Sequence, residues 1–227
     1  MDQRIAPFAA APRLIVKVGS SLLVEPDGHP RRTWLATLVA DIAARRAAGQ
    51  QVAVVSSGAI ALGARRLGLK AGGRASLEDA QAAASVGQIA LAALWAELLG
   101  AHGIQAAQLL LTLDDLDDRR RFLNAAATLD RLLALGAVPV INENDSVATG
   151  EIRFGDNDRL AARVAVAARA GAVLLLSDVE GLYTANPQDN PAAILVPDVP
   201  DLDALGADLR GAGAMGTGGM AAKVEAA

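Results

Sequence analysis

Short apolar runs alternate with longer segments of helical spacing along this chain of 227 residues. The short runs are rich in Val, Leu and Ile and end at small polar residues, which is typical of buried strands. The longer segments carry apolar side chains three and four positions apart, and most end at a glycine, as helices often do. We therefore predict strands at 13–18, 52–55, 106–111, 137–141 and 172–176, and helices at 33–48, 59–67, 77–99, 121–135 and 158–170, with Gly87 as a weak point of the third helix.

The order of these elements predicts the fold class. Strands and helices alternate throughout, which favours an α/β fold: a three-layer α/β/α sandwich with a mostly parallel central sheet. No repeat, linker or domain boundary interrupts the pattern, so residues 12–227 are expected to form one domain. Residues 1–11, with Pro7 and several alanines, are expected to be a poorly ordered lead. In such sheets ligands bind beyond the carboxyl ends of the strands, where polar clusters stand here at 17–20, 56–58, 142–145 and 177–178.

The stretch from Ile141 to Asp158 concentrates short polar side chains. Its eighteen residues include three asparagines, five acids and one arginine, with two glycines to turn the backbone. A site that holds a small charged molecule at defined angles needs such groups, whereas a solvated loop does not. The alternative interpretation of the stretch is a polar surface hairpin. Thr149-Gly150 resembles a tight turn between two short extended pieces, so we expect residues 146–154 to form a hairpin.

Composition narrows the functional classes. The chain has no cysteine, which excludes disulfides, thiolate metal sites and cysteine nucleophiles, and its two histidines, His29 and His102, lie in loop contexts. The formal net charge is −4, and the densest basic run, Arg119–Arg121, stands beside several aspartates, so nucleic acid is not an expected partner. We find neither an apolar run of membrane-spanning length nor a signal peptide, and therefore expect a cytoplasmic protein with no membrane partner.

Several glycine-containing loops favour an anionic ligand. The loops 19–21 and 56–58 present backbone N–H groups beside helix starts, and such groups attract phosphates. Lys17, between two valines, would add an ammonium group, although a lysine on an edge strand is the alternative interpretation. Gly216 to Lys223 is either a glycine loop that leads into a helix with a lysine about one turn inside, or a disordered tail. No G-x-x-x-x-G-K-[ST] pattern occurs, which excludes a P-loop nucleotidase.

Phosphoryl transfer is the chemistry that these features indicate together. Two lysines, anion-binding loops and a polar substrate loop supply the positioning and the charge cancellation on which such transfer depends. The segment Gly155–Asp158 adds acids and an amide at a helix start, where any one of them could instead be an N-cap. The candidate site has no histidine and no obvious general base, which favours a carboxylate acceptor, because a carboxylate is already ionised at neutral pH.

Seven segments of the chain resemble the amino acid kinase family, and within it the glutamate 5-kinases. They are Val16–Ser21, Ser56–Gly63, Arg121–Asn124, Val138–Asp145, Phe154–Asp158, Ser177–Thr184, and Gly216–Met220 with Lys223. The Lys17 loop, Ser177-Asp178 and the late lysine are shared by the general family, whereas the strings INEND and FGDND are much more specific to the glutamate branch. The resemblance covers the chain from about Leu14 to its end and implies the amino acid kinase fold.

The resemblance implies a reaction in which ATP, with Mg²⁺, phosphorylates the side-chain carboxylate of L-glutamate to L-glutamyl 5-phosphate, the first step of proline biosynthesis. It implies that Lys17 and Lys223 neutralise the transferring phosphoryl group and that Asp158 holds both lysines. Glutamate would be bound by Ser57, Asp145 and Asn157, with Asp145 suited to the ammonium group. The nucleotide would be bound by Lys17, Ser177, Asp178, Thr217, Gly218, Gly219, Met220 and Lys223, and no protein metal site is implied. A homodimer or homotetramer, feedback inhibition by proline, and glutamyl-phosphate reductase as a partner also come with the resemblance.

The chain departs from the family pattern in two places. The family loop reads Gly-Met-x-Thr-Lys, whereas Ala221-Ala222 precedes Lys223 here, so a hydroxyl is missing beside the nucleotide. The chain ends at Ala227, where the family continues, so we expect a kinase domain truncated at its C-terminal end and no PUA domain. Acetylglutamate, aspartate or uridylate kinase activity remains an alternative, as does a non-catalytic nucleotide or amino-acid sensor, which would predict the loss of a lysine or of Asp158.

Overall fold

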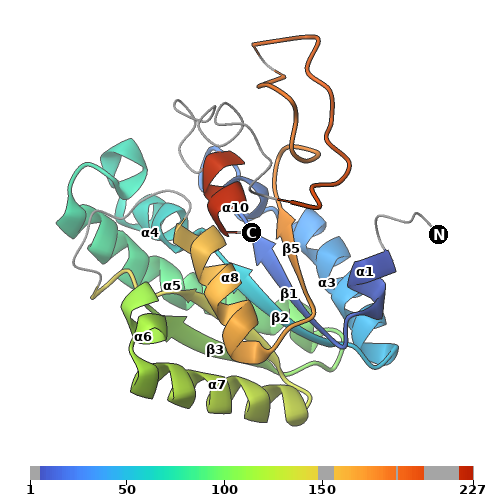
Figure 1. Cartoon of the computed structure of the whole chain (residues 1–227). Coiled ribbons are helices and arrows are strands. Elements are labelled where there is room, and N and C mark those ends of the chain that lie inside the picture. The colour runs from blue at the N-terminus through green and yellow to red at the C-terminus, as the bar shows by residue number, and fades with distance from the viewer. Residues whose placement is uncertain (1–5, 148–155, 188, 202–219, 227) are drawn as a thin grey trace.

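The computed structural model contains a sheet of five strands, all parallel, in the order β3-β4-β2-β1-β5 (Figure 1). The structure describes residues 6–147, 156–187, 189–201 and 220–226. The strands are β1 (Arg13–Val18), β2 (Gln51–Ser56), β3 (Ala106–Leu111), β4 (Val138–Glu143) and β5 (Ala172–Leu176). The parallel sheet confirms the predicted α/β class.

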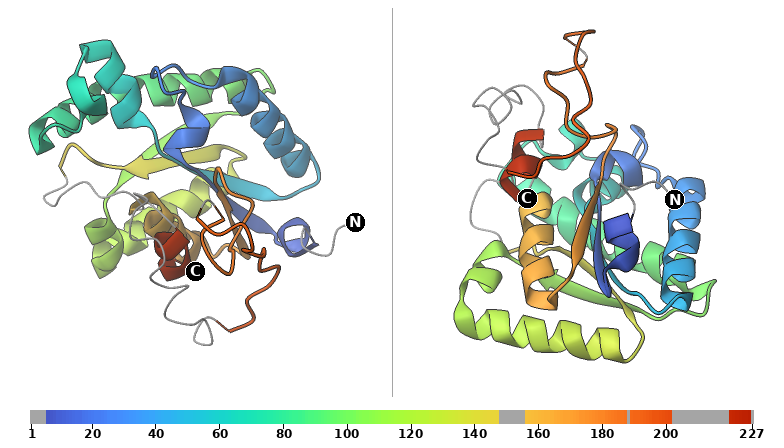
Figure 2. Two further views of the ribbon diagram at one scale, coloured as in Figure 1. Left: turned by 90° about the horizontal axis from the view of Figure 1, so that it is seen from above. Right: turned by 45° about the vertical axis from the view of Figure 1, so that its right-hand side comes forward.

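Helices cover both faces of this sheet, which gives the three predicted layers (Figure 2). The helices before β3 are α1 (Ala6–Ala10), α2 (Ser20–Leu23), α3 (Arg32–Ala47), α4 (Ala59–Leu67), the 3-10 turn η1 (Lys70–Gly73) and α5 (Leu77–Gly100). Those after it are α6 (Leu113–Asp117), α7 (Arg119–Ala134), α8 (Asp156–Ala168) and α10 (Met220–Ala226). The helices α3, α4 and α5 pack on one face, and α6, α7 and α8 pack on the other.

Alternate residues of β1 point to the two faces, as the twofold repeat of a strand requires. Leu14, Val16 and Val18 belong to the core with α3 and α5, whereas Ile15 belongs to the core with α8. Lys17 has the parity of Ile15. It therefore lies on the face that α8 covers, at the carboxyl end of the strand, and this placement brings its side chain to the start of α8.

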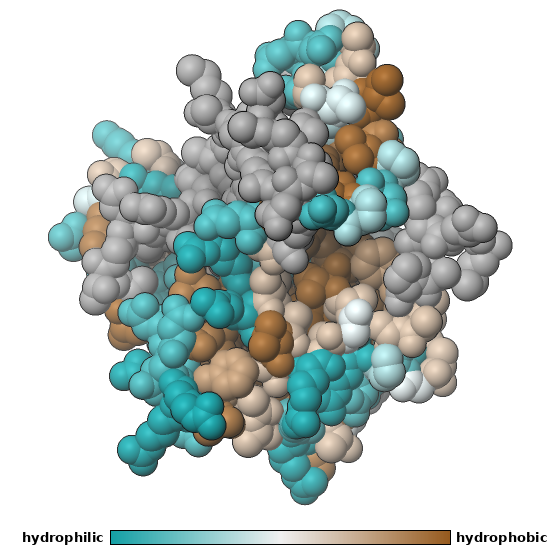
Figure 3. All heavy atoms as spheres, in the orientation of Figure 1, coloured by the Kyte–Doolittle hydropathy of each residue, from teal (hydrophilic) through white to brown (hydrophobic). Residues whose placement is uncertain are grey.

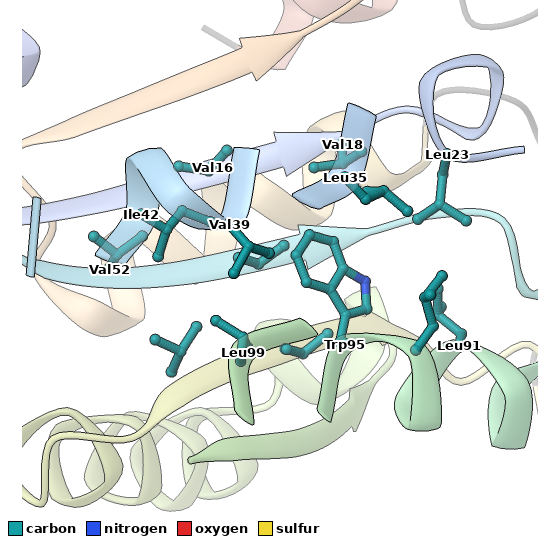
Figure 4. Packing of buried hydrophobic residues seen from close by; sticks show 14 of the residues in the cluster. Val16, Val18, Leu23, Leu35, Val39, Ile42, Val52, Leu91, Trp95 and Leu99 are labelled. Carbon is teal, nitrogen blue, oxygen red and sulfur yellow. The ribbon is translucent and has the colours of Figure 1, made fainter. Parts of the chain in front are cut away.

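Trp95 of α5 is the largest fully buried side chain. It lies at the centre of the first core, which is the one between the sheet and the helices α3, α4 and α5 (Figure 4). Its indole N–H donates to the hydroxyl of Ser56, 3.0 Å away, so the one polar atom of the ring has a partner. Val18, Leu35 and Leu91 surround it and are fully buried. The contact with Ser56 ties α5 to the last residue of β2, directly before the loop that carries Ser57.

The predicted elements agree with the structure to within two residues at every boundary. The short elements α1, α2, η1 and α6 were not predicted. The helix α1 lies in the range expected to be a poorly ordered lead; Phe8 packs against the first core, and the Gln50 amide donates to the carbonyl oxygens of Phe8 and Ala11, each 2.6 Å away. The predicted hairpin over 146–154 falls almost wholly at residues 148–155, outside the described residues.

Helix α5 corrects two expectations. Gly87 is not a weak point, because the helix continues through it and packs closely on α4: a Cβ at Gly87 would lie 1.7 Å from the carbonyl oxygen of Ala59. In length and composition α5 also qualifies as a membrane span, the one such helix in the described parts of the chain, so the expectation that no apolar run is long enough is wrong. The many alanines of α5 give it this high hydropathy. Eight of its residues are buried against α4 and the sheet, as in a core helix.

The segment that follows β5 projects from the end of the sheet where the strands terminate (Figures 1 and 2). An isolated antiparallel bridge joins Tyr183 to Leu195 within it. Apolar surface lies over this segment, where Ile194 is 69% exposed (Figure 3). Beside the outer edge of β5, Val173 and Leu175 line a cavity of about 370 Å³ that extends to Asp158 and Ala226.

Candidate active site

The carboxyl ends of all five strands lie at one edge of the sheet, because every pair is parallel. The loops after β1, β2, β4 and β5 therefore meet there, as the sequence pattern predicts for a ligand site. Helix α10, whose residues follow β5 by more than forty positions, packs against α8 at the same edge (Figure 1).

Two lysines from opposite ends of the chain pair with one aspartate. The Lys17 ammonium lies 2.6 Å from Oδ1 of Asp158, and the Lys223 ammonium lies 3.2 Å from Oδ2 of the same side chain. Asp158 is 1% exposed and stands in the first turn of α8, and the Lys223 side chain is 16% exposed. The carboxylate thus holds two cations within reach of one ligand, and the three side chains together carry one net positive charge.

Burial changes the acid–base behaviour of Lys17. Removal from water lowers its pKa from the ordinary value, the adjacent Asp158 carboxylate opposes that shift, Lys223 lowers the pKa further, and Asp178 raises it. The balance is a pKa below the ordinary value, so the ammonium form is held mainly by the carboxylate beside it. A charged lysine in this position is therefore dependent on Asp158.

The alternative interpretation of Lys17 as an edge-strand lysine is wrong. Its strand β1 lies between β2 and β5, with hydrogen-bonded neighbours on both sides. A buried lysine on an interior strand needs a partner, because an unpaired ammonium group is costly to remove from water. Gly19 lies beside the ammonium: a Cβ there would be in ordinary contact with the Lys17 nitrogen, at 3.7 Å.

Ser57 and Asn157, two residues expected to bind substrate, are in direct contact. The Asn157 amide nitrogen donates to the Ser57 hydroxyl at 2.8 Å and to Oδ1 of Asn142 at 3.3 Å. Ser57 is buried, and its backbone N–H donates to the carbonyl of Val18. Gly58 then takes φ +105°, a left-handed conformation that glycine adopts without strain, and a Cβ there would meet Leu23 at 2.8 Å.

Asp145, the third of these residues, is 8% exposed and lies two residues after the end of β4. It lines a cavity of about 320 Å³ together with Gln88, Gln108 and Glu143. The guanidinium of Arg74 lies close enough for the Asp145 charge to raise its pKa, although burial lowers the pKa of Arg74 more. An anionic side chain in a concave pocket of this size suits a small cationic group.

The residues expected to bind the nucleotide are placed only in part. Ser177 follows β5 directly, and its hydroxyl donates to Oδ1 of Asp178 at 3.2 Å. Asp178 is exposed and influences the pKa of Lys17, so it lies on the side of the lysine pair. Met220 begins α10, whereas Thr217, Gly218 and Gly219 lie outside the described residues.

Three residues at this edge had no role in the sequence-based prediction. Asn142 stood in the polar stretch but received no function, Arg74 follows η1, and Gln88 sits in the middle of α5. Asn142 could have been found from its position directly after the apolar residues of β4. Arg74 and Gln88 carry no local signal, because only tertiary packing brings η1 and α5 near the substrate loops.

Within the described residues, the carboxylates at this edge do not form a cluster that could hold a metal ion alone. Both oxygens of Asp158 face lysines. Throughout the described ranges, no three His, Cys, Asp or Glu side chains gather as metal ligands. A Mg²⁺ ion usually keeps several waters and binds through one or two carboxylates plus substrate phosphates.

Comparison with known proteins identifies the family. The sequence model of the amino acid kinase family matches residues 12–227. Glutamate 5-kinase of Sphingopyxis alaskensis is 66% identical over 224 residues, 97% of this chain and 61% of that protein. Glutamate 5-kinase of Novosphingobium aromaticivorans is 66% identical over 99% of this chain and 60% of its own length, and that of Zymomonas mobilis is 64% identical over 95% and 55%. The chain thus spans about three fifths of the length of these curated relatives, and it belongs to the amino acid kinase family.

Proposed function

We propose that the chain catalyses ATP-dependent phosphorylation of the side-chain carboxylate of L-glutamate, which forms L-glutamyl 5-phosphate for proline biosynthesis. The observation that carries the proposal is the ion triad of Lys17, Asp158 and Lys223 at the carboxyl edge of a parallel sheet. Relatives named glutamate 5-kinase, at 64–66% identity, support the same reaction.

In this reaction a carboxylate oxygen of glutamate forms a bond to the γ-phosphorus of ATP, and the bond from that phosphorus to the bridging oxygen breaks. The electron pair leaves with ADP. The acceptor has a reference pKa of about 4.3, so no proton has to be removed and no general base is required. This accounts for the charged groups proposed to meet the transferring phosphoryl group, which are two ammonium ions and the carboxylate that orients them.

The two lysines would act on the charge that moves. Lys17 and Lys223 would lie against the oxygens of the transferring phosphoryl group, which they would neutralise as the bridging oxygen gains charge. Asp158 would fix both ammonium groups in place before the nucleotide binds, so that little reorganisation accompanies the transfer. Mg²⁺, bound to the phosphates, would supply further charge neutralisation.

Substrate recognition would fall to the loops after β2 and β4 and to the start of α8. Asp145 would pair with the ammonium group of glutamate, and Ser57 and Asn157 would complete the amino-acid subsite. Ser177, Asp178 and residues 217–220 would hold the nucleotide. We further propose a cytoplasmic homodimer or homotetramer that proline inhibits and that passes its unstable acyl phosphate to glutamyl-phosphate reductase.

The test is a coupled assay of ADP release with L-glutamate, L-aspartate, N-acetyl-L-glutamate and UMP as acceptors. We expect L-glutamate to give the highest kcat/KM, and hydroxylamine to trap the product as a hydroxamate, because acyl phosphates react with it. A preference for any other acceptor would replace this assignment by another kinase of the family. Binding of ATP and glutamate without ADP release would instead indicate a sensor.

A further inference from the structure

A chain of amide side chains connects the middle of helix α5 to the proposed glutamate site. The Asn142 amide nitrogen donates to Oε1 of Gln88 at 2.8 Å. Oδ1 of Asn142 accepts from the Asn157 amide nitrogen at 3.3 Å, and that nitrogen also donates to the Ser57 hydroxyl at 2.8 Å. Four elements of the fold, α5, β4, α8 and the loop after β2, are thereby joined by three side-chain hydrogen bonds.

Each bond in this chain fixes the direction of the next. A carboxamide has one acceptor end and one donor end. Gln88 accepts a hydrogen bond from the Asn142 nitrogen, so the Asn142 carbonyl points toward Asn157. Asn157 therefore donates to it through its amide nitrogen. Both hydrogens of that nitrogen are then used, one for Asn142 and one for Ser57.

At Asn157, this series of side-chain hydrogen bonds leaves one acceptor without a partner among the described residues. Oδ1 of Asn157 is buried and has no hydrogen-bond partner in the described part of the chain. A buried acceptor without a partner is unfavourable, and its natural complement is a donor on a ligand. At neutral pH the ammonium group is the donor that L-glutamate offers, since both of its carboxylates are ionised.

Close packing fixes Gln88 relative to the site. Its neighbour Gly87 crosses α4 so tightly that a Cβ would lie 1.7 Å from the Ala59 carbonyl, and a Cβ at Gly63 would lie 1.8 Å from the carbonyl of Ala83. Helix α4 begins directly after Ser57 and Gly58. Gln88 therefore lies on α5 and Ser57 lies directly before α4, and the backbone contact between these two helices keeps the distance between Gln88 and Ser57 constant.

We propose that Gln88 is a positioning residue that orients Asn157 and so determines which end of the Asn157 amide meets the amino-acid substrate. The inference rests on the proposed function for the identity of that substrate. Gln88 sets the direction by presenting an acceptor, and Asn142 transmits it. With an acceptor lost at position 88, Asn142 and Asn157 are free to rotate, and the substrate meets a mixture of donor and acceptor.

The test compares Gln88→Met, which removes the acceptor at similar length, with Gln88→Glu, which keeps it. Gln81→Met, two turns earlier on the same helix, is the matched control. We expect Gln88→Met to raise the KM for L-glutamate about 10- to 100-fold, as expected when a buried polar group loses its partner. The KM for ATP should stay within about twofold, and kcat should change little. Gln88→Glu and Gln81→Met should stay within about threefold of the unsubstituted chain.

Two results for the KM of L-glutamate would overturn the inference. One is a KM for L-glutamate in Gln88→Met that matches the unsubstituted chain, and the other is a Gln88→Glu variant as impaired as Gln88→Met. A parallel rise in the KM for ATP would show a general structural role instead and would also contradict the proposal. Partial misfolding does not obscure these outcomes, because KM is independent of the concentration of active enzyme. Calorimetric titration of the unsubstituted chain with L-glutamate separates the two questions: no binding there refutes the proposed function, whereas the variants test the role of Gln88.

Discussion

Replacement of Asp158 by asparagine tests the central ion triad most directly. The change keeps the shape of the side chain and removes its charge, so Lys17 and Lys223 lose their shared counter-ion. Lys17 is 6% exposed and cannot recover its hydration by a small movement, whereas Lys223 is more accessible. The consequences therefore concentrate on Lys17.

Two estimates give the size of the loss in the free energy of unfolding. Removal of one partner from a buried ion pair destabilises a protein by about 3–5 kcal/mol. Lys17 can escape part of this by losing its proton, which at pH 7 costs about 4.6 kcal/mol relative to an unfolded lysine of reference pKa about 10.4, at about 1.36 kcal/mol per pH unit. The two routes are of similar size, so we expect Asp158→Asn to lower the free energy of unfolding by about 3–5 kcal/mol at pH 7 and to reduce kcat by several orders of magnitude.

The destabilisation caused by Asp158→Asn should decrease as the pH rises. Burial lowers the pKa of Lys17, and loss of the Asp158 charge, which raises it, lowers the pKa further. In the window between that lowered pKa and the ordinary value near 10.5, the unfolded chain binds more protons than the folded one, so stability rises with pH. From pH 7 to pH 9 the destabilisation of Asp158→Asn relative to the parent should thus shrink, by at most about 2.7 kcal/mol.

Urea unfolding at the two pH values, with a double-mutant cycle, measures this. We expect Lys17→Met combined with Asp158→Asn to recover most of the stability lost in Asp158→Asn alone, because the stranded charge is gone, while activity stays low. If Asp158→Asn were as stable as the parent and the second substitution restored nothing, Lys17 and Asp158 would not form a buried pair, and the account of the site would fail.

Three further predictions follow from the same contacts. In a profile of kcat against pH, the parent should lose activity as Lys17 deprotonates below the ordinary lysine pKa, whereas Lys17→Arg, however slow, should show no such alkaline decline; identical profiles would contradict this. Asp145→Asn should raise the KM for L-glutamate about 10- to 100-fold without a change for ATP, and an unchanged KM would remove Asp145 from the amino-acid subsite. Gly87→Ala should lower the free energy of unfolding by at least about 1–3 kcal/mol in thermal or urea melts, because the added Cβ meets the Ala59 carbonyl, and a parent-like melt would mean that the helices separate easily.

Local pattern was sufficient to predict the sheet. The short apolar runs at Arg13–Val18 and Ala172–Leu176 gave strand boundaries that match the structure, because strands of a sheet covered by helices on both faces carry short, continuous apolar sequences. The parallel arrangement then followed from the alternation of strands and helices. The short helix α1 escaped prediction because its stability comes from tertiary contacts, those of Phe8 with the core and of Gln50 with the backbone.

Individual site residues were predictable where chemistry and position coincided. Lys17 is unusual because a charged side chain interrupts a run of buried residues, and Asp158 stands at a helix start in a polar stretch; both peculiarities are visible in the sequence. That the two side chains lie 2.6 Å apart could be expected only from the resemblance to a family, since 140 positions separate them and no local rule links them.

The position of Gln88 beside the proposed substrate site could not be predicted from the local sequence. A glutamine among alanines in a long apolar helix has no distinguishing pattern, and the glycine before it predicts a weakness in the helix. In the folded chain the same glycine permits backbone contact with α4, and that contact brings the amide of Gln88 within 2.8 Å of Asn142. The position of Gln88 is thus a property of two helices and a strand together. Substitutions at Gly87 and Gln88 should separate the two contributions, since the first disturbs the frame and therefore stability, whereas the second leaves the frame intact and alters only what the substrate meets.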